Sequence, residues 1–386
     1  MITLGLGFLL FFVAGMSDGS MYLPAKYTKQ WKWEHYWSVF SLTFFVISWI
    51  LTFILIPDVF GIYAGIATKE IIVLAAFGAL WGIGAILFGL ACHLVGMALT
   101  FPVALGTVAC LGTLIPLLTT ESDSLFRLKG LVLIIGLGIT VIGIFVCSLA
   151  FKGREDAAKK TNEKRPTSLV AGLLVAVFAG VFSALLNVGF SFSDNVVAAA
   201  KKFGASDTSA STAVWALFFS VAFVVNVAYC LFLMVKHHTL KGFWGPHIKR
   251  NFSLGVAMGA CFTCAIFIYS MGTTYLGDWG EVPGWVAFMS IDIITGNVWG
   301  IWTGEWNTAP KIARKLLNWG MIIILIAIGV VAVSQAIKVK TDAADDKVLQ
   351  ESKNVPRLIC TKTQADRFFW RTNVDILFMF ERRMPL

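Results

Sequence analysis

The residue of this sequence best suited to proton chemistry is Asp292, which lies in an apolar stretch beside a ridge of small residues. Gly296, Gly300 and Gly304 follow it at every fourth position, so all four share one face of a helix. An Asp near the centre of a bilayer costs about 2.5–3.5 kcal/mol. Because burial disfavours the charged form of a carboxyl group, Asp292 suits a proton carrier or an acceptor of hydrogen bonds. A structural hydrogen bond is the alternative.

Three other titratable residues lie near the ends of apolar stretches. Asp18 closes the first stretch and is the second candidate for proton coupling, with a solvated helix end as the alternative. His93 precedes a short turn, and an interfacial position explains it. Glu305 is interpreted as a helix cap or as an ion-pair partner of Lys311.

Five uncharged side chains at membrane depth could contact a small ligand. Asn187 and Asn297 are polar, and such groups usually face the inside of a helix bundle, either as links between helices or as site residues. Trp81, Tyr269 and Trp299 offer flat ring faces, which small-molecule sites commonly use. Packing in the core or a place in the interfacial belt is the alternative for each ring.

The stretch 78–97 around Trp81 predicts the wall of an internal cavity. It carries no Asp, Glu, Lys or Arg, yet it holds five glycines, each of which costs a helix about 1 kcal/mol. Gly78, Gly82 and Gly84 make one helix surface nearly flat, which lets another helix or a ligand approach closely.

Composition places these residues in an all-α polytopic membrane protein. Of the 386 residues 58% are hydrophobic and only 14% are charged, against about 25% charged in soluble domains. Apolar runs near the length of a bilayer-spanning helix recur through the chain, whereas a β-barrel would show short alternating segments. The first run lacks a basic start and a cleavage site, so it is interpreted as a retained helix.

Ten transmembrane helices are predicted. The expected ranges are 2–23, 37–56, 78–97 (begun near Lys69), 97–118, 128–150, 168–190, 211–235, 253–272, 283–303 and 316–337.

The net charge of +9 follows from membrane topology rather than from nucleic-acid binding. Loops after the odd-numbered helices hold 16 Lys and Arg residues, against 5 after the even-numbered ones. The positive-inside rule therefore places the first group of loops in the cytoplasm and both termini outside. The ten basic residues of the tail argue for the opposite orientation.

The cysteines predict neither a disulfide framework nor a metal site. Six of the seven lie inside apolar runs, and Cys261 and Cys264 have no histidine or second cysteine pair beside them. They are interpreted as small core side chains, so no cofactor and no metal are expected.

Two halves of the chain repeat one another. The stretch Gly7 to Gly15 matches Gly172 to Gly180, and the pair Gly78 and Gly82 matches Gly255 and Gly259. The expected division is a first five-helix repeat 1–151, a basic cytoplasmic linker 152–167, a second repeat 168–337 and a tail 338–386 of no assigned role. Because five is odd, the second copy enters the membrane inverted, an arrangement that supports alternating access around a midplane site.

Short strings along the chain carry a resemblance to a known family. In order they are Tyr22-x-Pro24-x-Lys26, Trp31-x-Trp33, Trp37-Ser38-Val39, Trp81-Gly82-Ile83-Gly84, Gly89-Leu90, Gly96-Met97, Gly112-Thr113 and Glu305-Trp306-Asn307. Over about residues 1–337 the chain resembles the bacterial L-rhamnose–proton symporter family of the drug/metabolite transporter superfamily.

The resemblance implies ten helices as two inverted five-helix repeats, located in the bacterial inner membrane. It also implies uptake of a deoxy-sugar with a proton, with helices 1, 3, 4, 6, 8 and 9 lining the cavity. On that basis Trp81, Tyr269 and Trp299 become candidates for stacking on the sugar. Asn187 and Asn297 become candidates for binding its hydroxyl groups.

Two other classes of function are alternatives to sugar symport. One is a transporter of the same fold that exchanges or exports another metabolite. The other is a membrane-embedded enzyme, which needs a Ser–His, paired-Asp or His-rich metal constellation at membrane depth. No such motif is present in the sequence, so an enzyme is not expected. Neither the sugar nor the oligomeric state follows from the sequence.

Overall fold

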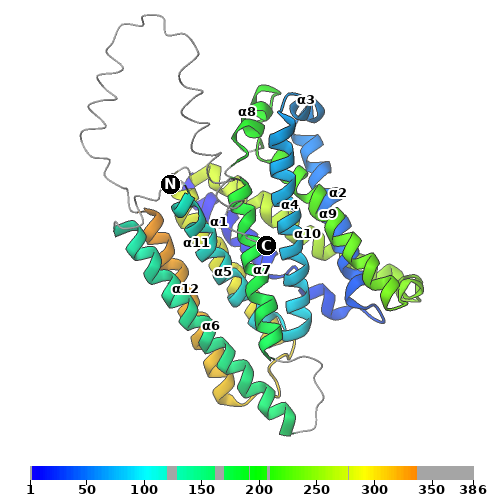
Figure 1. Ribbon diagram of the computed structural model, residues 1–386, viewed down its shortest axis with the longest axis vertical. Helices are drawn as coiled ribbons and strands as arrows, with labels where there is room; N and C mark the ends of the chain where they lie inside the picture. Colours follow the sequence, from blue (N-terminus) through cyan, green and yellow to red (C-terminus); the bar gives the residue numbers. More distant parts are fainter. Residues whose placement is uncertain are drawn as a thin grey trace, which may run out of the picture. The chain divides into compact units, whose positions relative to one another are not determined.

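The computed structural model describes residues 2–119, 128–160, 169–190, 192–206, 209–276 and 278–336. In these residues all regular secondary structure is helical, and ten helices have 18 residues or more (Figure 1). The long helices are α1 (Ile2–Gly19), α2 (Trp33–Leu55), α4 (Thr68–Val95), α5 (Met97–Thr119), α6 (Leu128–Lys160), α7 (Leu169–Phe190), α9 (Thr212–Lys236), α10 (Ile248–Leu276), α11 (Asp278–Trp302) and α12 (Lys311–Ala336). The short ones are η1 (Leu23–Tyr27), α3 (Val59–Ala64), α8 (Asp194–Lys202) and η3 (Leu240–Trp244).

Eight segments of the described chain are long and apolar enough to cross a membrane. They lie in α1, α2, α4, α6, α7, α9, α10 and α12, and α5 adds a shorter apolar segment, Met97–Gly112. The protein is therefore a multi-pass membrane protein.

Several helices extend beyond the ranges expected from the sequence. Helix α4 begins at Thr68 and α2 at Trp33, where the side chain of His35 accepts a 2.9 Å hydrogen bond from the backbone nitrogen of Lys32. Helix α6 continues to Lys160, so the first part of the expected linker 152–167 is helical. The rest of that linker and the tail 338–386 lie outside the described residues.

Glycine and other small residues set the close contacts between helices. Helix α4 packs against α7 and α9, and a Cβ added at Gly82 would lie 2.9 Å from Cα of Ala222 in α9. At Gly84 it would lie 2.8 Å from the backbone nitrogen of Ser183 in α7. Inside lipid the hydrophobic effect does not drive helices together, so close packing of this kind supplies part of the attraction between them. Helices α6 and α12 pack along each other, as Figure 1 shows.

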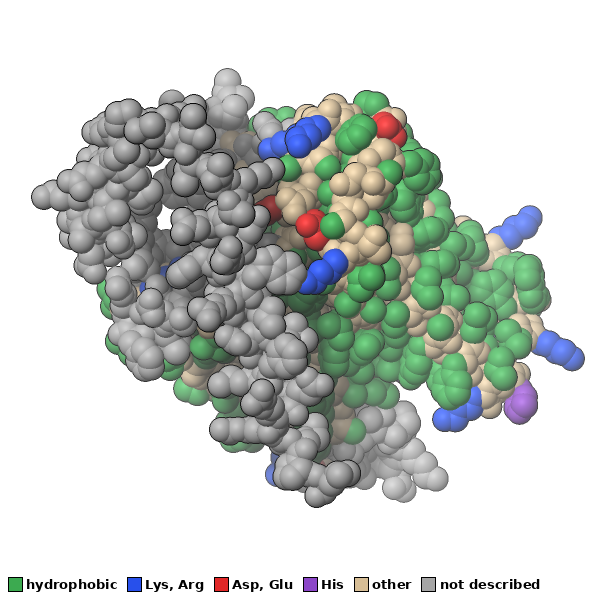
Figure 2. Space-filling model, turned by 45° about the horizontal axis from the view of Figure 1, so that its top comes forward, with side chains coloured by type: hydrophobic (Ala, Val, Ile, Leu, Met, Phe, Trp, Pro, Cys, Tyr) green, Lys and Arg blue, Asp and Glu red, His purple; other side chains and the backbone are tan. Residues whose placement is uncertain are grey.

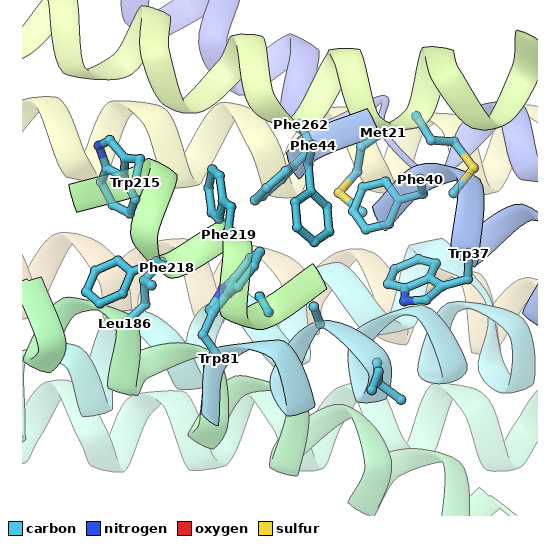
Figure 3. Close-up of a cluster of buried hydrophobic side chains, with 14 of the residues drawn as sticks. Met21, Trp37, Phe40, Phe44, Trp81, Leu186, Trp215, Phe218, Phe219 and Phe262 are labelled. Carbon is cyan, nitrogen blue, oxygen red and sulfur yellow. The ribbon is translucent and has the colours of Figure 1, made fainter. Parts of the chain in front are cut away.

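Aromatic side chains fill the space between α2, α4, α9 and α10 (Figure 3). The rings of Trp81 and Phe262 stack with centroids 5.5 Å apart, and Phe44 meets Trp81 edge to face at 5.9 Å. Phe219 lies 5.2 Å from Trp81 on another side. Offset-stacked and edge-to-face pairs of this kind add about 0.5–1.5 kcal/mol each beyond burial.

The outer surface has the apolar character that lipid requires. Large side chains such as Val141, Phe145 and Val224 are more than half exposed. Figure 2 shows hydrophobic side chains across the described part of one face, with few charged groups among them.

Candidate functional site

Helix α1 approaches helix α11 closely because two glycines face it. A Cβ added at Gly15 would lie 2.8 Å from the carbonyl oxygen of Phe288, and one at Gly19 would lie 2.7 Å from that of Asp292. On another face of α11, Gly296 and Gly300 lie against Phe101 and Ala98 of α5. Gly296 and Gly300 of the expected ridge therefore form a surface of close helix packing, whereas Gly304 lies beyond the end of α11 at a φ of 84°.

Asp292 takes part in this contact between α1 and α11 through its carbonyl oxygen, which lies against Gly19. Its side chain is only 1% exposed, and Oδ1 has no hydrogen-bond partner among the described residues. Asp18 is half-buried and directly precedes Gly19, whose added Cβ would lie 2.7 Å from the carbonyl oxygen of Asp292. The structure thus brings together the segments of α1 and α11 that carry the two carboxyl groups singled out in the sequence.

Polar contacts continue along α1 and α11 from the carboxyl pair toward the ends of both helices. The indole Nε1 of Trp299 donates a 2.8 Å hydrogen bond to Oγ of Ser20. The hydroxyl of Thr303 donates to the carbonyl of Trp299 at 2.7 Å and accepts a hydrogen bond from Nζ of Lys26. These contacts lead to a polar pocket.

The pocket has a volume of about 350 Å³ and opens at the end of the bundle where α4 turns into α5. Its polar side chains come from η1, α2, α4, α6 and the segment after α11. The hydroxyl groups of Tyr22 and Tyr36 form a 2.9 Å hydrogen bond with each other. The lining residues are Tyr22, Ala25, Lys26, Tyr36, Cys92, His93, Leu94, Val95, Gly96, Arg154, Gly304 and Glu305.

Glu305 joins three of the segments that form the pocket. Its carboxylate lies 2.5 Å from Nζ of Lys26 and accepts hydrogen bonds from the backbone nitrogens of Met97 (2.9 Å) and Ala98 (3.1 Å). It therefore caps the first turn of α5, where unpaired N–H groups and the helix dipole favour an anion. The cap expected for Glu305 is confirmed, whereas its ion-pair partner is Lys26 and not Lys311.

Arg154 closes the pocket from the side of α6. Its guanidinium donates to the backbone carbonyls of Glu305 (3.3 Å) and Val95 (3.4 Å). It also lies 4.5 Å above the ring of Phe151 and 4.8 Å above that of Trp306. These contacts explain how a charged side chain that is only 4% exposed is accommodated.

The predicted sugar contacts are packed in this structure. Trp81 is 6% exposed within its cluster of rings. Tyr269 lies between Phe11 and Phe288, with ring centroids 5.3 Å and 4.9 Å away. Asn297 donates to the carbonyl of Ala98 at 3.1 Å.

Of the seven predicted site residues, none is among those lining the pocket. Trp299 bonds to Ser20. Asn187 lies in α7, and its side chain is outside the part of the chain that the structure describes.

Sequence reasoning missed the main pocket residues. Lys26 lies in a stretch rich in tryptophan, where a lysine is typical of an interfacial anchor, so its type and surroundings did not indicate a pocket residue. Arg154 is one of several charged residues that follow the fifth apolar run, and nothing in the sequence distinguishes it from the others. The string Tyr22-x-Pro24-x-Lys26 was the one available signal, since two of its members line the pocket. Among the described residues no cluster of three His, Cys, Asp or Glu side chains could hold a metal.

Comparisons with known proteins cover the whole helical part of the chain. The family model for the L-rhamnose-proton symport protein (RhaT) matches residues 1–337. The L-rhamnose-proton symporter of Escherichia coli O1:K1 is 26% identical over 343 residues, covering 87% of this chain and 98% of the relative. That of Klebsiella pneumoniae is 27% identical with the same coverage, and that of Citrobacter koseri is 26% identical over 349 residues. On this evidence the chain belongs to the L-rhamnose–proton symport protein family.

Proposed function

We propose that this protein takes up L-rhamnose or a closely related sugar together with a proton across the bacterial inner membrane. The observation that carries the proposal is the family match, which spans all ten long helices. The curated relatives are themselves named L-rhamnose-proton symporters. The family is one of transporters, so an enzymatic function is excluded.

The proton-binding element in this proposal is the pair Asp292 and Asp18. Asp292 is buried, its Oδ1 has no partner among the described residues, and Asp18 lies across the contact between α1 and α11. Two ionised carboxylates in one desolvated place repel each other, so such a pair retains a proton more readily than a solvated carboxylate does. Movement of α1 against α11 would separate the two carboxyl groups and so change how readily the pair retains a proton.

One proton transported with each sugar molecule is sufficient to accumulate the sugar against its concentration gradient. A charge moved through 100 mV supplies about 2.3 kcal/mol. Since each 1.4 kcal/mol is a factor of ten, this concentrates a neutral sugar roughly 40-fold.

For the sugar itself, the contacts expected from the sequence remain proposals. They are Trp81, Asn187, Tyr269, Asn297 and Trp299. Stacking on Trp81 requires the ring of Phe262, which covers one of its faces, to move aside. This site therefore belongs to a conformation that differs from the present one.

We also propose that the ten helices form two inverted five-helix repeats, 1–151 and 168–337, around this path. Most of the main helix contacts are reproduced when the helices of one half are exchanged for those of the other. In this exchange α1, α2, α4, α5 and α6 correspond, in order, to α7, α9, α10, α11 and α12. The contact of α4 with α7 becomes that of α10 with α1, and the contact of α4 with α9 becomes that of α10 with α2. Such an exchange pattern is expected of a pseudo-two-fold axis.

Matched glycines support the repeat at the level of single residues. Gly82 of α4 lies against Ala222 of α9, and its counterpart Gly259 of α10 lies against Thr43 of α2. Likewise Gly15 packs on α11 and Gly180 packs on α5. The helix pairs in both comparisons are those that the exchange relates.

Uptake into proteoliposomes tests the function. An inward proton gradient should drive accumulation of labelled L-rhamnose, and a protonophore should abolish it. Uptake that ignores the gradient, or counterflow with an unrelated metabolite alone, would instead indicate an exchanger or exporter of another compound.

A further inference from the structure

The polar pocket has unused hydrogen-bonding capacity at its two tyrosines. Tyr22 and Tyr36 are 3% and 5% exposed, and one hydrogen bond joins their hydroxyl oxygens. Each phenol carries one hydrogen, so this bond uses one of the two. The described residues offer no acceptor for the other, and both side chains line the pocket. A buried donor of this kind needs a partner.

The ion pair beside the tyrosines also has capacity left. A carboxylate offers about four acceptor positions, and that of Glu305 accepts from Lys26, Met97 and Ala98. The ammonium of Lys26 has three N–H groups and donates to Glu305 and Thr303. One acceptor position of Glu305 and one donor of Lys26 are therefore unused, and both side chains line the pocket, as His93 does.

The charged side chains that line the pocket are engaged with the protein itself, which suits a neutral ligand. Lys26 and Glu305 neutralise each other at 2.5 Å. Arg154 directs its guanidinium at two backbone carbonyls and at two ring faces. A ligand with groups that both donate and accept, such as the hydroxyls of a monosaccharide, matches the mixture of donors and acceptors that is left.

We propose that this pocket is a second sugar site, at the end of the transport path, in which Tyr22, Tyr36, Lys26 and Glu305 bind the hydroxyl groups of a neutral monosaccharide. This inference rests on the proposed function. The volume of about 350 Å³ lies within the range of about 300–1,000 Å³ that small-molecule sites occupy. The loops at this end belong to the Lys- and Arg-rich group, so the site is the one from which the sugar leaves for the cytoplasm.

Sugar binding to the purified full-length protein in detergent tests the site, by isothermal titration with L-rhamnose. The double variant Tyr22→Phe, Tyr36→Phe removes both hydroxyls and keeps both rings. Because the two hydroxyl groups bond to each other, removing both leaves neither without its hydrogen-bond partner. The double variant should therefore fold with a thermal midpoint near that of the wild type. We expect its Kd for L-rhamnose to rise about tenfold, the effect of roughly one lost hydrogen bond to the ligand.

Tyr63→Phe is the matched control. The Tyr63 hydroxyl donates to the carbonyl of Ala213 at 2.7 Å, and Tyr63 is not among the residues lining the pocket. Its removal should leave the Kd within about twofold. An equal loss of affinity in the control would show that the effect is not local, and the proposal would fall.

Two further outcomes separate this proposal from the proposed function. If the wild type takes up L-rhamnose but the double variant binds it with unchanged Kd, the pocket is not a sugar site and the function stands. If the wild type neither binds nor transports L-rhamnose or a closely related sugar, both are wrong. Tighter binding of a hexuronate than of L-rhamnose would overturn the assignment to a neutral ligand.

Discussion

The indole nitrogen of Trp37 in α2 donates a 2.7 Å hydrogen bond to Oδ1 of Asn226 in α9. The amide nitrogen of Asn226 in turn donates to the carbonyls of Gly82 in α4, at 3.0 Å, and of Ala222, at 2.8 Å. One fully buried amide therefore ties three helices together beside the cluster of rings around Trp81. Its hydrogen bonds are made where no water can replace them.

Asn226→Leu should lower the free energy of unfolding by about 1–2 kcal/mol, because the indole N–H of Trp37 loses its acceptor. Denaturant unfolding of purified protein in detergent measures the change. Ser220→Ala is the control: Ser220 accepts a 2.8 Å hydrogen bond from Trp49, but both side chains are only half-buried. A larger loss for Ser220→Ala than for Asn226→Leu would contradict this ranking.

Asp292→Asn should damage gradient-driven uptake more than sugar exchange. The amide keeps the size of the carboxyl group but cannot bind and release a proton, whereas exchange at equal pH on both sides needs no net proton transfer. Proteoliposomes allow both rates to be measured on one preparation. Asp18→Asn should give the same split to a smaller extent, because Asp18 is only half-buried. Equal retention of both activities in Asp292→Asn would remove its proposed role.

The helical architecture was predictable because lipid leaves the chain few options. Apolar runs of spanning length must be helices, and each of the ten expected ranges overlaps a long helix. In the described residues, however, only eight segments are long and apolar enough to cross a membrane. The helix ends were predicted less accurately. The sequence does not show that α6 continues into polar residues, where Arg154 donates hydrogen bonds to two backbone carbonyls. Those partners are supplied by residues far away in the chain.

The candidate site was predictable only in part. Asp292 was accessible to reasoning because a carboxyl group in an apolar run is costly wherever it lies. The pocket was not, because Tyr22, Lys26 and Glu305 each have an ordinary interfacial explanation. Only the folding of η1 against the segment after α11 brings Lys26 and Glu305 together.

Gly82→Ala and Gly259→Ala should destabilise the protein to similar extents. In α4 the added Cβ would lie 2.9 Å from Cα of Ala222, and in α10 it would lie 2.8 Å from the carbonyl oxygen of Phe40. Gly138→Ala in α6 is the control, because no atom lies within 4 Å of its added Cβ. Thermal midpoints should fall for the first two variants and stay level for the third. Opposite behaviour of Gly82→Ala and Gly259→Ala would argue against equivalent positions in two repeats.

Deleting the tail 338–386 should leave proton-driven uptake intact. The family match ends at residue 337, and the ten long helices all precede that point. Initial uptake rates, normalised to the amount of protein in the membrane, compare the truncated and full-length chains. Complete loss of uptake by correctly inserted truncated protein would assign the tail a part in transport.

Glu305→Gln and Lys26→Gln should be strongly non-additive. Each single variant leaves a charged partner at a place that is 13–20% exposed, whereas the double variant removes both charges. The singles should therefore lose about 1–3 kcal/mol of stability and the double should lose less than their sum. Glu305→Gln should be the more damaging single change, because its carboxylate also caps α5 through Met97 and Ala98. A double-mutant cycle with a coupling energy near zero would show that the ion pair does not hold this end of the bundle together.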